Sequence, residues 1–231
     1  MKSVYFLSDA HLGCRSIPHD RTRERRLVHF LDGIKDKASA VYLLGDIFDF
    51  WYEYKTVVPR GYTRFLGKLS ELADRGVEVH FFTGNHDIWC GDYLVKECGV
   101  TLHTEPMTVE MGDKVFMLAH GDGLGDPDRK FRFLRAVFRN RLCQRMFSCI
   151  HPRWAVDFGL SWAAHSRLKH GVEGGDPPYL GEDKEYLVRF AKEYLKAHSE
   201  INYFIFGHRH IELDLMLTRS SRVLILGDWI T

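Results

Sequence analysis

The chain has 231 residues, of which 45% are hydrophobic and 27% are charged. This length and composition predict a folded globular body and exclude a disordered, fibrous or disulfide-stapled chain. The 32 Lys and Arg residues nearly balance the 31 Asp and Glu residues, so the net charge of +1 does not by itself demand a nucleic-acid or membrane partner. The five cysteines include no Cys-x-x-Cys pair, so neither a disulfide framework nor a thiolate zinc site is predicted.

Short β-branched and aromatic runs alternate along the chain with amphipathic, charge-rich stretches, which predicts an α/β protein. In chain order, the runs expected to form buried strands are Val4–Leu7, Val41–Leu44, Val77–Phe82, Val115–Leu118, Tyr203–Phe206 and Val223–Leu226. The stretches expected to form helices are Arg21–Lys37, Tyr62–Arg75, Tyr93–Glu97 and Lys184–His198. Gly112-Asp113, between Thr108–Met111 and the fourth strand run, predicts a hairpin.

Five of the six predicted strands are followed directly by side chains that commonly bind metal ions. These segments are Ser8-Asp9-Ala10-His11, Gly45-Asp46-Ile47-Phe48-Asp49, Gly84-Asn85-His86-Asp87, His120-Gly121-Asp122 and Gly207-His208-Arg209-His210. A single such segment is most often a turn or a cap, but side chains at the carboxyl ends of strands converge on one crevice, and five together indicate a site. Carboxylate, imidazole and amide ligands without a thiolate favour Mn, Fe or Zn.

This set of segments resembles the five sequence blocks of the calcineurin-like metallophosphoesterases, over nearly the whole chain. The resemblance implies an α/β, four-layer fold of two facing mixed β-sheets flanked by helices. It also implies two divalent metal ions, with Mn²⁺ the first expectation and Fe or Zn the alternatives. Carried over residue by residue, one ion is held by Asp9, His11, Asp46 and His210, and the other by Asp46, Asn85, His120 and His208. Asp46 bridges the two.

Two divalent ions activate a water molecule and withdraw charge from phosphoryl oxygens, so such an enzyme needs no nucleophilic side chain. The leaving oxygen must still be stabilised. The resemblance gives this role to His86, as a cation or proton donor oriented by Asp49; the alternative for His86 is a spacer beside Asn85. Asp228 also follows a strand run, and we interpret it as structural because seven other positions already fill two sites.

Within that superfamily the chain is similar to the UDP-2,3-diacylglucosamine diphosphatases of bacterial lipid A synthesis. The similarity rests on the block that begins at His120, the helical insertion after it and the closing Leu226-Gly227-Asp228-Trp229. It implies cleavage of the pyrophosphate of UDP-2,3-diacylglucosamine to UMP and 2,3-diacylglucosamine 1-phosphate. One departure is His86, where the best-known members carry Arg. The alternatives are a phosphoesterase for soluble nucleotides or phosphodiesters and, in another class, a metal-free scaffold, which is disfavoured because no ligand is missing.

The insertion, residues 129–170, carries ten basic residues and one acidic residue, so its net charge is +9 and that of the remaining chain is −8. Aromatic and aliphatic residues alternate with these charges largely at helical spacing, which favours a lipid- or membrane-binding lid within a single 1–231 domain. The resemblance implies that its substrate is a lipid-linked UDP-sugar. A stripe packed on the protein's own core is the alternative. Nucleic acid is not expected, because the remaining chain would repel it. The family's substrate contacts correspond here to Asn85, Asp128, Arg129, Ser166 and Arg167.

The first residues contain no apolar run long enough for a signal peptide, and no apolar run approaches the ~20 residues of a membrane-spanning helix. We therefore expect a cytoplasmic protein, peripheral on the inner face of the cytoplasmic membrane. The sequence leaves the oligomeric state open.

Overall fold

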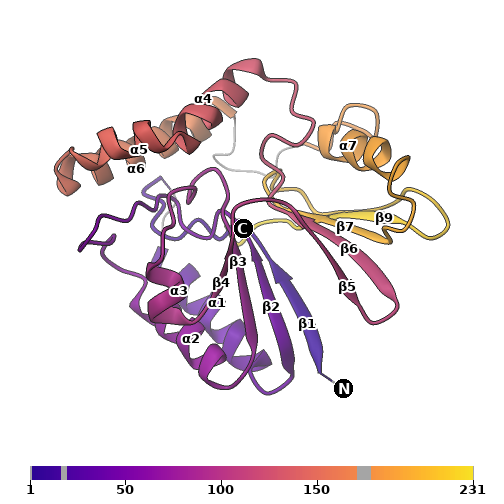
Figure 1. Ribbon diagram of the computed structural model, residues 1–231, viewed down its shortest axis with the longest axis horizontal. Coiled ribbons are helices and arrows are strands. Elements are labelled where there is room, and N and C mark those ends of the chain that lie inside the picture. The colour runs from indigo at the N-terminus through magenta and orange to yellow at the C-terminus, as the bar shows by residue number, and fades with distance from the viewer. Residues whose placement is uncertain (1, 17–19, 171–177, 231) are drawn as a thin grey trace.

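Two β-sheets face each other across a shared apolar layer, and their ends converge at one edge (Figure 1). The computed structural model describes residues 2–16, 20–170 and 178–230, with the side chains of 165–170 outside this description. The first sheet has the order β1 (Ser3–Leu7), β2 (Ala38–Leu44), β3 (Glu78–Phe82) and β4 (Thr101–His103), and its pairs are parallel. Our expectation of two mixed sheets was therefore wrong for this one, because a helix connects each strand before β4 to the next.

The second sheet is mixed, as expected. Its order is β5 (Met107–Met111), β6 (Lys114–Ala119), β7 (Tyr203–Phe206), β9 (Arg222–Ile225) and β8 (Leu213–Met216). The three inner strands are parallel, whereas β5 and β8 pair antiparallel at the edges. The hairpin between β5 and β6 turns at Gly112, which has a φ of 63° and so a conformation that favours glycine. The chain thus presents the carboxyl ends of β6, β7 and β9 at one edge.

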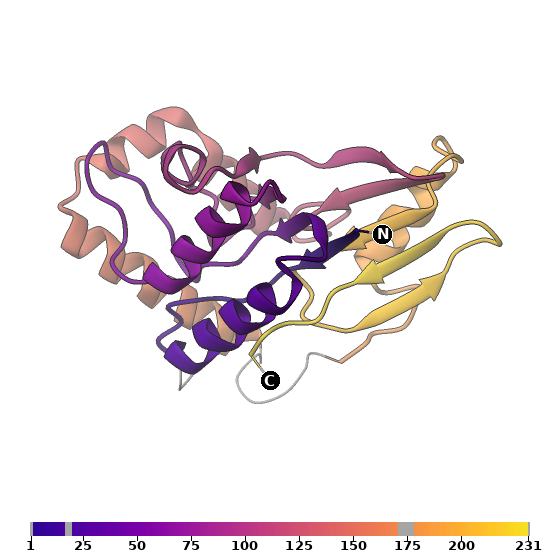
Figure 2. The ribbon, with the colours of Figure 1, turned by 90° about the horizontal axis from the view of Figure 1, so that it is seen from below.

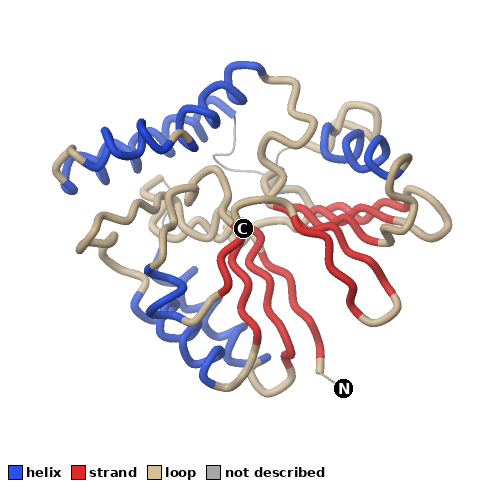
Figure 3. The backbone as a smooth tube through the Cα atoms, viewed as in Figure 1, coloured by secondary structure: helices blue, strands red, loops and turns tan. Residues whose placement is uncertain are grey.

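Helices cover the outer face of each sheet (Figure 3). The first sheet packs against α1 (Asp20–Ile34), α2 (Thr63–Asp74) and α3 (Tyr93–Cys98), and the second against α7 (Tyr186–Leu195). In α1, Leu27, Leu31 and Ile34 are buried at four- and three-residue spacing, the stripe expected of a helix that covers a sheet. Between the sheets, Phe6 and Phe116 stack with ring centroids 6.1 Å apart. The predicted helix–sheet–sheet–helix layering is confirmed.

The differences from the predicted elements lie at edges and ends. The two short edge strands β4 and β8 were not predicted, because three or four residues with half-exposed faces carry little pattern. The first helix ends at Ile34 rather than Lys37, because the next charged residues form a turn in which the Lys37 N–H donates to the Ile34 carbonyl at 2.9 Å.

The insertion consists of α4 (Arg129–Arg139), α5 (Arg141–Ser148) and α6 (Pro152–His170), which we call the lid helices. They lie apart from the two sheets, above the edge where the sheets converge (Figures 1 and 2). Asp128 caps α4 by accepting the N–H groups of Lys130 at 2.8 Å and Phe131 at 3.3 Å. Asn140 ends α4 and caps α5 in the same way. None of the described helices is long and apolar enough to cross a membrane.

Candidate metal centre

The loops that leave β1, β2, β3, β6 and β7 bring the predicted ligands together where the two sheets converge. Among the described residues, six that are not glycine have a positive φ, and five of them are predicted ligands: Asp9, His11, Asp46, His208 and His210. Left-handed backbone is costly for such residues and gathers at functional sites. The fold therefore maintains strained backbone at the predicted ligands.

Two glycines allow the ligand loops to approach each other closely. A Cβ at Gly84 would lie 2.2 Å from Oδ1 of Asp46, and a Cβ at Gly207 would lie 2.5 Å from Oδ2 of Asp9. Real Cβ atoms do not approach other atoms so closely. Glycine at both positions lets backbone of one loop lie against a carboxylate of another.

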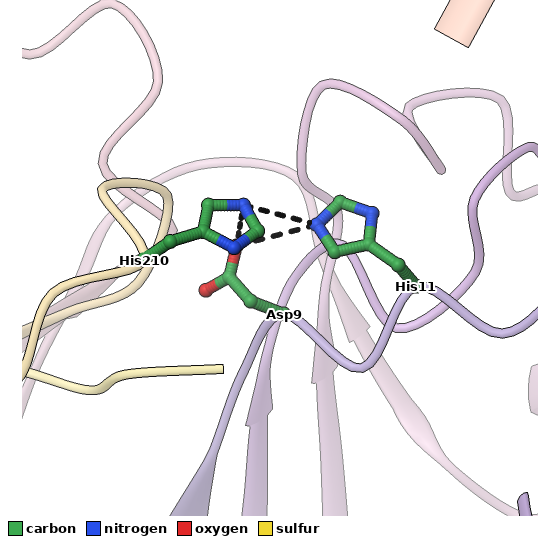
Figure 4. A group of neighbouring side chains, drawn as sticks. All are labelled: Asp9, His11 and His210. Atoms are coloured by element: carbon green, nitrogen blue, oxygen red, sulfur yellow. Dashed lines mark hydrogen bonds and ion pairs between the residues drawn. The ribbon is translucent and has the colours of Figure 1, made fainter. Parts of the chain in front are cut away.

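The first ligand group consists of Asp9, His11 and His210, whose ligand atoms lie within 4.8 Å of one another (Figure 4). Nε2 of His11 lies 3.2 Å from Nε2 of His210, and Oδ1 of Asp9 lies 3.7 Å and 3.5 Å from these two nitrogens. Oδ1 of Asp9 is buried and has no hydrogen-bond partner. A buried carboxylate oxygen facing two imidazole nitrogens is the donor set of a divalent cation, so these residues fit a metal ion.

The second ligand group consists of Asp46, His120 and His208, and its ligand atoms also lie within 4.8 Å of one another. Nε2 of His120 is 3.3 Å from Oδ2 of Asp46 and 3.2 Å from Oδ1 of Asn85. Nδ1 of His120 lies 2.8 Å from the Leu44 carbonyl, which orients the ring. The structure thus brings Asn85 to this group.

Asp46 stands between the two groups. Its Oδ2 is 3.3 Å from Nε2 of His120 and 3.8 Å from Nε2 of His11, which belongs to the first group. Its Oδ1 accepts the backbone N–H of His86 at 2.8 Å. One carboxylate oxygen therefore faces both groups, as a bridging ligand must.

The carboxylates of Asp9 and Asp46 both have lowered pKa values, which favours their ionised form. Burial alone would raise the pKa of Asp9, but His210 and His11 outweigh burial and lower that pKa to about 2. Burial would also raise the pKa of Asp46, but His120 and His86 hold it well below its usual range. Buried negative charge requires compensation, which a bound cation provides. The charge of the site thus agrees with its donor set.

Burial and neighbouring charges also shift the pKa values of the two histidines of the second group. Burial would lower the pKa of His120, but the Asp46 carboxylate outweighs it and raises that pKa well above its usual range. Burial and then the charge of His120 lower the pKa of His208 to about 3. A neutral imidazole is the form that binds a metal ion, so His208 has the ligand form before any ion binds.

The family model for calcineurin-like phosphoesterases matches residues 2–212 of the chain. This chain belongs to the calcineurin-like phosphoesterase family. It is 47% identical over 98% of its length to a Porphyromonas gingivalis protein named UDP-2,3-diacylglucosamine hydrolase, of which it covers 90%. A Neisseria meningitidis protein of the same name is 29% identical over 99% of this chain and 90% of its own length. Among solved structures, the phosphoesterase Yfce from E. coli aligns with 98% of this chain and 79% of its own at 13% identity and a TM-score of 0.42.

Asp87 is a supporting residue of this phosphoesterase to which the sequence argument gave no role. It is fully buried, and its carboxylate accepts N–H groups of Gly84 at 2.7 Å, Ile47 at 2.9 Å, and Asp46 and Phe48 at 3.3 Å. Burial and the charge of Asp46 raise its pKa to about 7. One side chain thus joins the loops after β2 and β3, which carry ligands of the second group.

His86 of the phosphoesterase lies beside the ligands and lines the cavity described next. Its Nδ1 lies 2.9 Å from the Asp49 carbonyl and 3.8 Å from Oδ1 of the same residue. The Asp49 carboxylate lies closer to Nδ1 of His11, at 3.4 Å. Asp49 therefore orients His86 through its backbone carbonyl, and its carboxylate faces a ligand of the first group as well.

A cavity of about 400 Å³ lies between the metal centre and the lid helices. Its polar lining includes Asn85 and His86 of the ligand loops and Lys130 at the start of α4. The rest of the lining consists mainly of aromatic and aliphatic side chains from the body and the lid helices: Phe50, Ile88, Trp89, Phe131, Leu134, Phe138, Phe158, Trp162 and Ala163. A cavity that combines a few polar side chains with a mainly apolar lining suits an amphipathic molecule.

The predicted substrate contacts are placed unequally. Asn85 and Asp128 line the cavity, although Asp128 also caps α4. Arg129 is exposed at the first turn of α4, outside the cavity lining. The backbone of Ser166 and Arg167 belongs to α6, but their side chains lie outside the described part of the chain.

Proposed function

We propose that this phosphoesterase is a dimetal hydrolase that cleaves the pyrophosphate of UDP-2,3-diacylglucosamine to UMP and 2,3-diacylglucosamine 1-phosphate. The observation that carries the proposal is the cavity, because it runs from His86 beside the ligand groups to an apolar chamber under the lid helices. A diphosphate reaches the metal centre at one end while acyl chains are sheltered at the other. Two relatives with this hydrolase name, similar over 98% and 99% of the chain, support the same substrate.

In this proposal Asp9, His11, Asp46 and His210 hold one divalent ion, and Asp46, Asn85, His120 and His208 hold the other. We infer Mn²⁺ from the oxygen- and nitrogen-rich donor set, with Fe or Zn as alternatives. Bound divalent ions supply activation of water and withdrawal of charge from the phosphoryl group. The chain's own contribution is to hold the donors. Asp228 orients His210, the Leu44 carbonyl orients His120, and Asp87 holds the loops that carry ligands of the second group.

His86 acts in this proposal on the leaving oxygen. The Asp49 carbonyl holds Nδ1, which sets the orientation of the ring, and the ring lines the cavity where the substrate phosphates lie. An imidazole can donate a proton to that oxygen or, as a cation, stabilise its negative charge. Lys130 lines the same cavity, and in this proposal it binds a phosphate. Asn85, Asp128, Arg129, Ser166 and Arg167 remain our proposed substrate contacts.

The lid helices serve two functions in the proposal, as part of one 1–231 domain. Their inner face packs on the body: Tyr52 donates to the Gln144 carbonyl at 2.8 Å, and Trp89 donates to the Phe138 carbonyl at 2.7 Å. Their outer face exposes apolar side chains, with Phe133 72% and Trp154 68% exposed. An exposed apolar and basic surface is suited to the membrane–water interface, so we propose peripheral contact with the inner face of the cytoplasmic membrane.

The basic residues of the lid helices divide into two sets. Arg135 forms an ion pair with Asp122, and Arg139 pairs with Glu105 at 2.6 Å. These two hold α4 against the body. Among the described side chains, Arg132, Arg141, Arg145 and Arg153 are exposed and available to lipid, and Arg129, which is also exposed, is our proposed substrate contact.

The competing function is hydrolysis of soluble nucleotides or phosphodiesters, with the insertion as a simple cover. The experiment compares UMP release from UDP-2,3-diacylglucosamine in mixed micelles and from UDP-N-acetylglucosamine, each with Mn²⁺. We expect kcat/KM to favour the acylated substrate by at least about a hundredfold, since burying a few methylene groups already supplies that difference. Equal rates on both would contradict the proposal in favour of the soluble substrate class.

A further inference from the structure

A buried ion pair lies behind the ligand loop that follows β7. Glu185 directly precedes α7 and has no exposed surface. Its carboxylate does not cap its own helix. Instead, Oε2 accepts Nε of Arg209 at 2.9 Å and Oε1 accepts Nη2 of the same guanidinium at 2.9 Å. This two-point arrangement fixes the guanidinium in direction as well as in distance.

Arg209 is the residue between two predicted ligands, His208 and His210. Both ligands have left-handed backbone, with φ values of 69° and 53°. The N–H of Arg209 donates to the Gly207 carbonyl at 2.8 Å, which closes a tight turn. Strained backbone of this kind persists only where surrounding contacts hold it. The ion pair with Glu185 is such a contact, because it anchors the residue between the two strained ligands.

Glu185 also holds the segment that leads into α7, residues 178–185, which we call the return segment. Its Oε1 accepts the N–H of Leu180 at 3.1 Å, and its own N–H donates to the Gly181 carbonyl at 3.0 Å. The same carboxylate therefore joins this return segment to the ligand loop. The first residue of α7, Tyr186, adds a ring contact with His208 at a centroid distance of 6.4 Å.

The start of the insertion is attached to the same ligand group. Asp122 is 4% exposed, stands two residues after His120 and pairs with Arg135 of α4. The ring of Phe131, also in α4, lies 5.9 Å from the ring of His208. Helix α4, at the start of the insertion, and the residues at the start of α7 thus both contact the loops that carry His120 and His208.

We propose that Arg209 is a positioning residue: held by Glu185, it fixes His208 and His210 for metal binding and makes their placement depend on the return segment of the lid. The inference rests on the two metal sites of the proposed function and adds a coupling between lid and metal. Partners that orient metal ligands typically change metal affinity or activity by about 10- to 100-fold when replaced.

The test is Mn²⁺ titration by calorimetry of purified apo-protein, wild type and three variants. Arg209→Gln should weaken Mn²⁺ binding by about 10- to 100-fold. Glu185→Gln keeps an amide oxygen for Leu180 but loses the charge, and it should weaken binding by about tenfold. Arg222→Gln is the control, because Arg222 forms an ion pair with Asp214 at 3.0 Å in the same sheet, away from the ligands. Its Mn²⁺ affinity should equal that of the wild type.

A second readout separates positioning from stability alone. Turnover of bis-p-nitrophenyl phosphate, a small soluble diester, should fall in Arg209→Gln at low Mn²⁺ and recover as Mn²⁺ is raised. Wild-type Mn²⁺ affinity in both folded variants, with only a lower Tm, would overturn the inference. If Arg209→Gln does not fold, Glu185→Gln decides the test by itself: wild-type Mn²⁺ affinity in that variant overturns the inference. Wild-type protein that binds two Mn²⁺ but leaves the acylated substrate intact would contradict the proposed function instead. Wild-type protein that binds no Mn²⁺ would overturn both.

Discussion

The carboxylate of Asp228 lies 2.8 Å from Nδ1 of His210, on the side of the ring opposite the metal centre. The other carboxylate oxygen accepts the N–H of Ile230 at 2.8 Å, so the side chain is held at both oxygens. A carboxylate at Nδ1 keeps the proton there and leaves Nε2 free to face Asp9 and His11. Asp228, which the sequence argument treated as structural, thus orients a predicted ligand.

Replacing Asp228 with Asn should therefore weaken Mn²⁺ binding by about 10- to 100-fold while the fold is retained, since ligand-orienting carboxylates have effects of this size. Calorimetric Mn²⁺ titration measures the affinity. The matched control is Asp214→Asn, an exposed position on β8. Unchanged affinity in Asp228→Asn would return this residue to a purely structural role.

Replacing Asp46 with Ala should abolish hydrolysis and remove at least one metal ion. Its carboxylate faces both ligand groups, and no neighbouring group can compensate both cations in its place. Metal content by elemental analysis and UMP release measure the two effects. Added Mn²⁺ should also raise the Tm of wild-type protein by more than that of the variant, because the variant binds fewer ions. Near-normal turnover with two ions bound would refute the bridging assignment.

His86→Ala should behave differently from the ligand variants. If His86 assists the leaving oxygen, the variant keeps its metal content while the chemical step slows by roughly 10²–10⁴, the usual range for acid–base assistance. Single-turnover kinetics with elemental analysis separate the two quantities. His198→Ala serves as the control, because this partly exposed histidine lies beyond the end of α7, where its ring stacks on Tyr194. Loss of metal in His86→Ala would make His86 a ligand. The ligand atoms of His86, His11 and Asp46 do lie within 4.8 Å of one another.

The exposed lid arginines should determine vesicle binding. A triple change of Arg132, Arg141 and Arg145 to Glu should weaken binding to anionic vesicles, because each basic side chain near such a surface contributes about 1 kcal/mol. The effect should fade at high salt. Co-sedimentation with anionic vesicles measures it, and turnover of a small soluble diester should change little.

The control for this lid variant is a triple change of exposed arginines outside the insertion, Arg21, Arg25 and Arg219, to Glu. It alters the net charge equally but leaves the lid intact. Equal loss of vesicle binding in both triple variants would show a general charge effect. Wild-type protein that ignores vesicles would contradict the proposed membrane contact.

Much of this phosphoesterase was determined by the sequence alone. Buried strand runs such as Val41–Leu44 and Tyr203–Phe206 carry their own pattern, because a strand buried on both faces is apolar throughout. Polar residues at strand ends, such as Asp46 and His208, stand out directly after such runs. The order and spacing of these segments were sufficient to indicate the family and the layered fold, both of which are confirmed.

Only the tertiary structure decided how the supporting residues act. Asp87 and Asp122 stood in the predicted segments without a role, because a carboxylate that accepts backbone N–H groups and one that pairs with an arginine look alike in sequence. Glu185 and Arg209 are 24 residues apart, and nothing in their local patterns predicts an ion pair. The short edge strand β8 depends on pairing with β9 rather than on its own residues. Partners that are distant in the chain meet only after the sheets have packed, so side-chain pairing of this kind has no local signal.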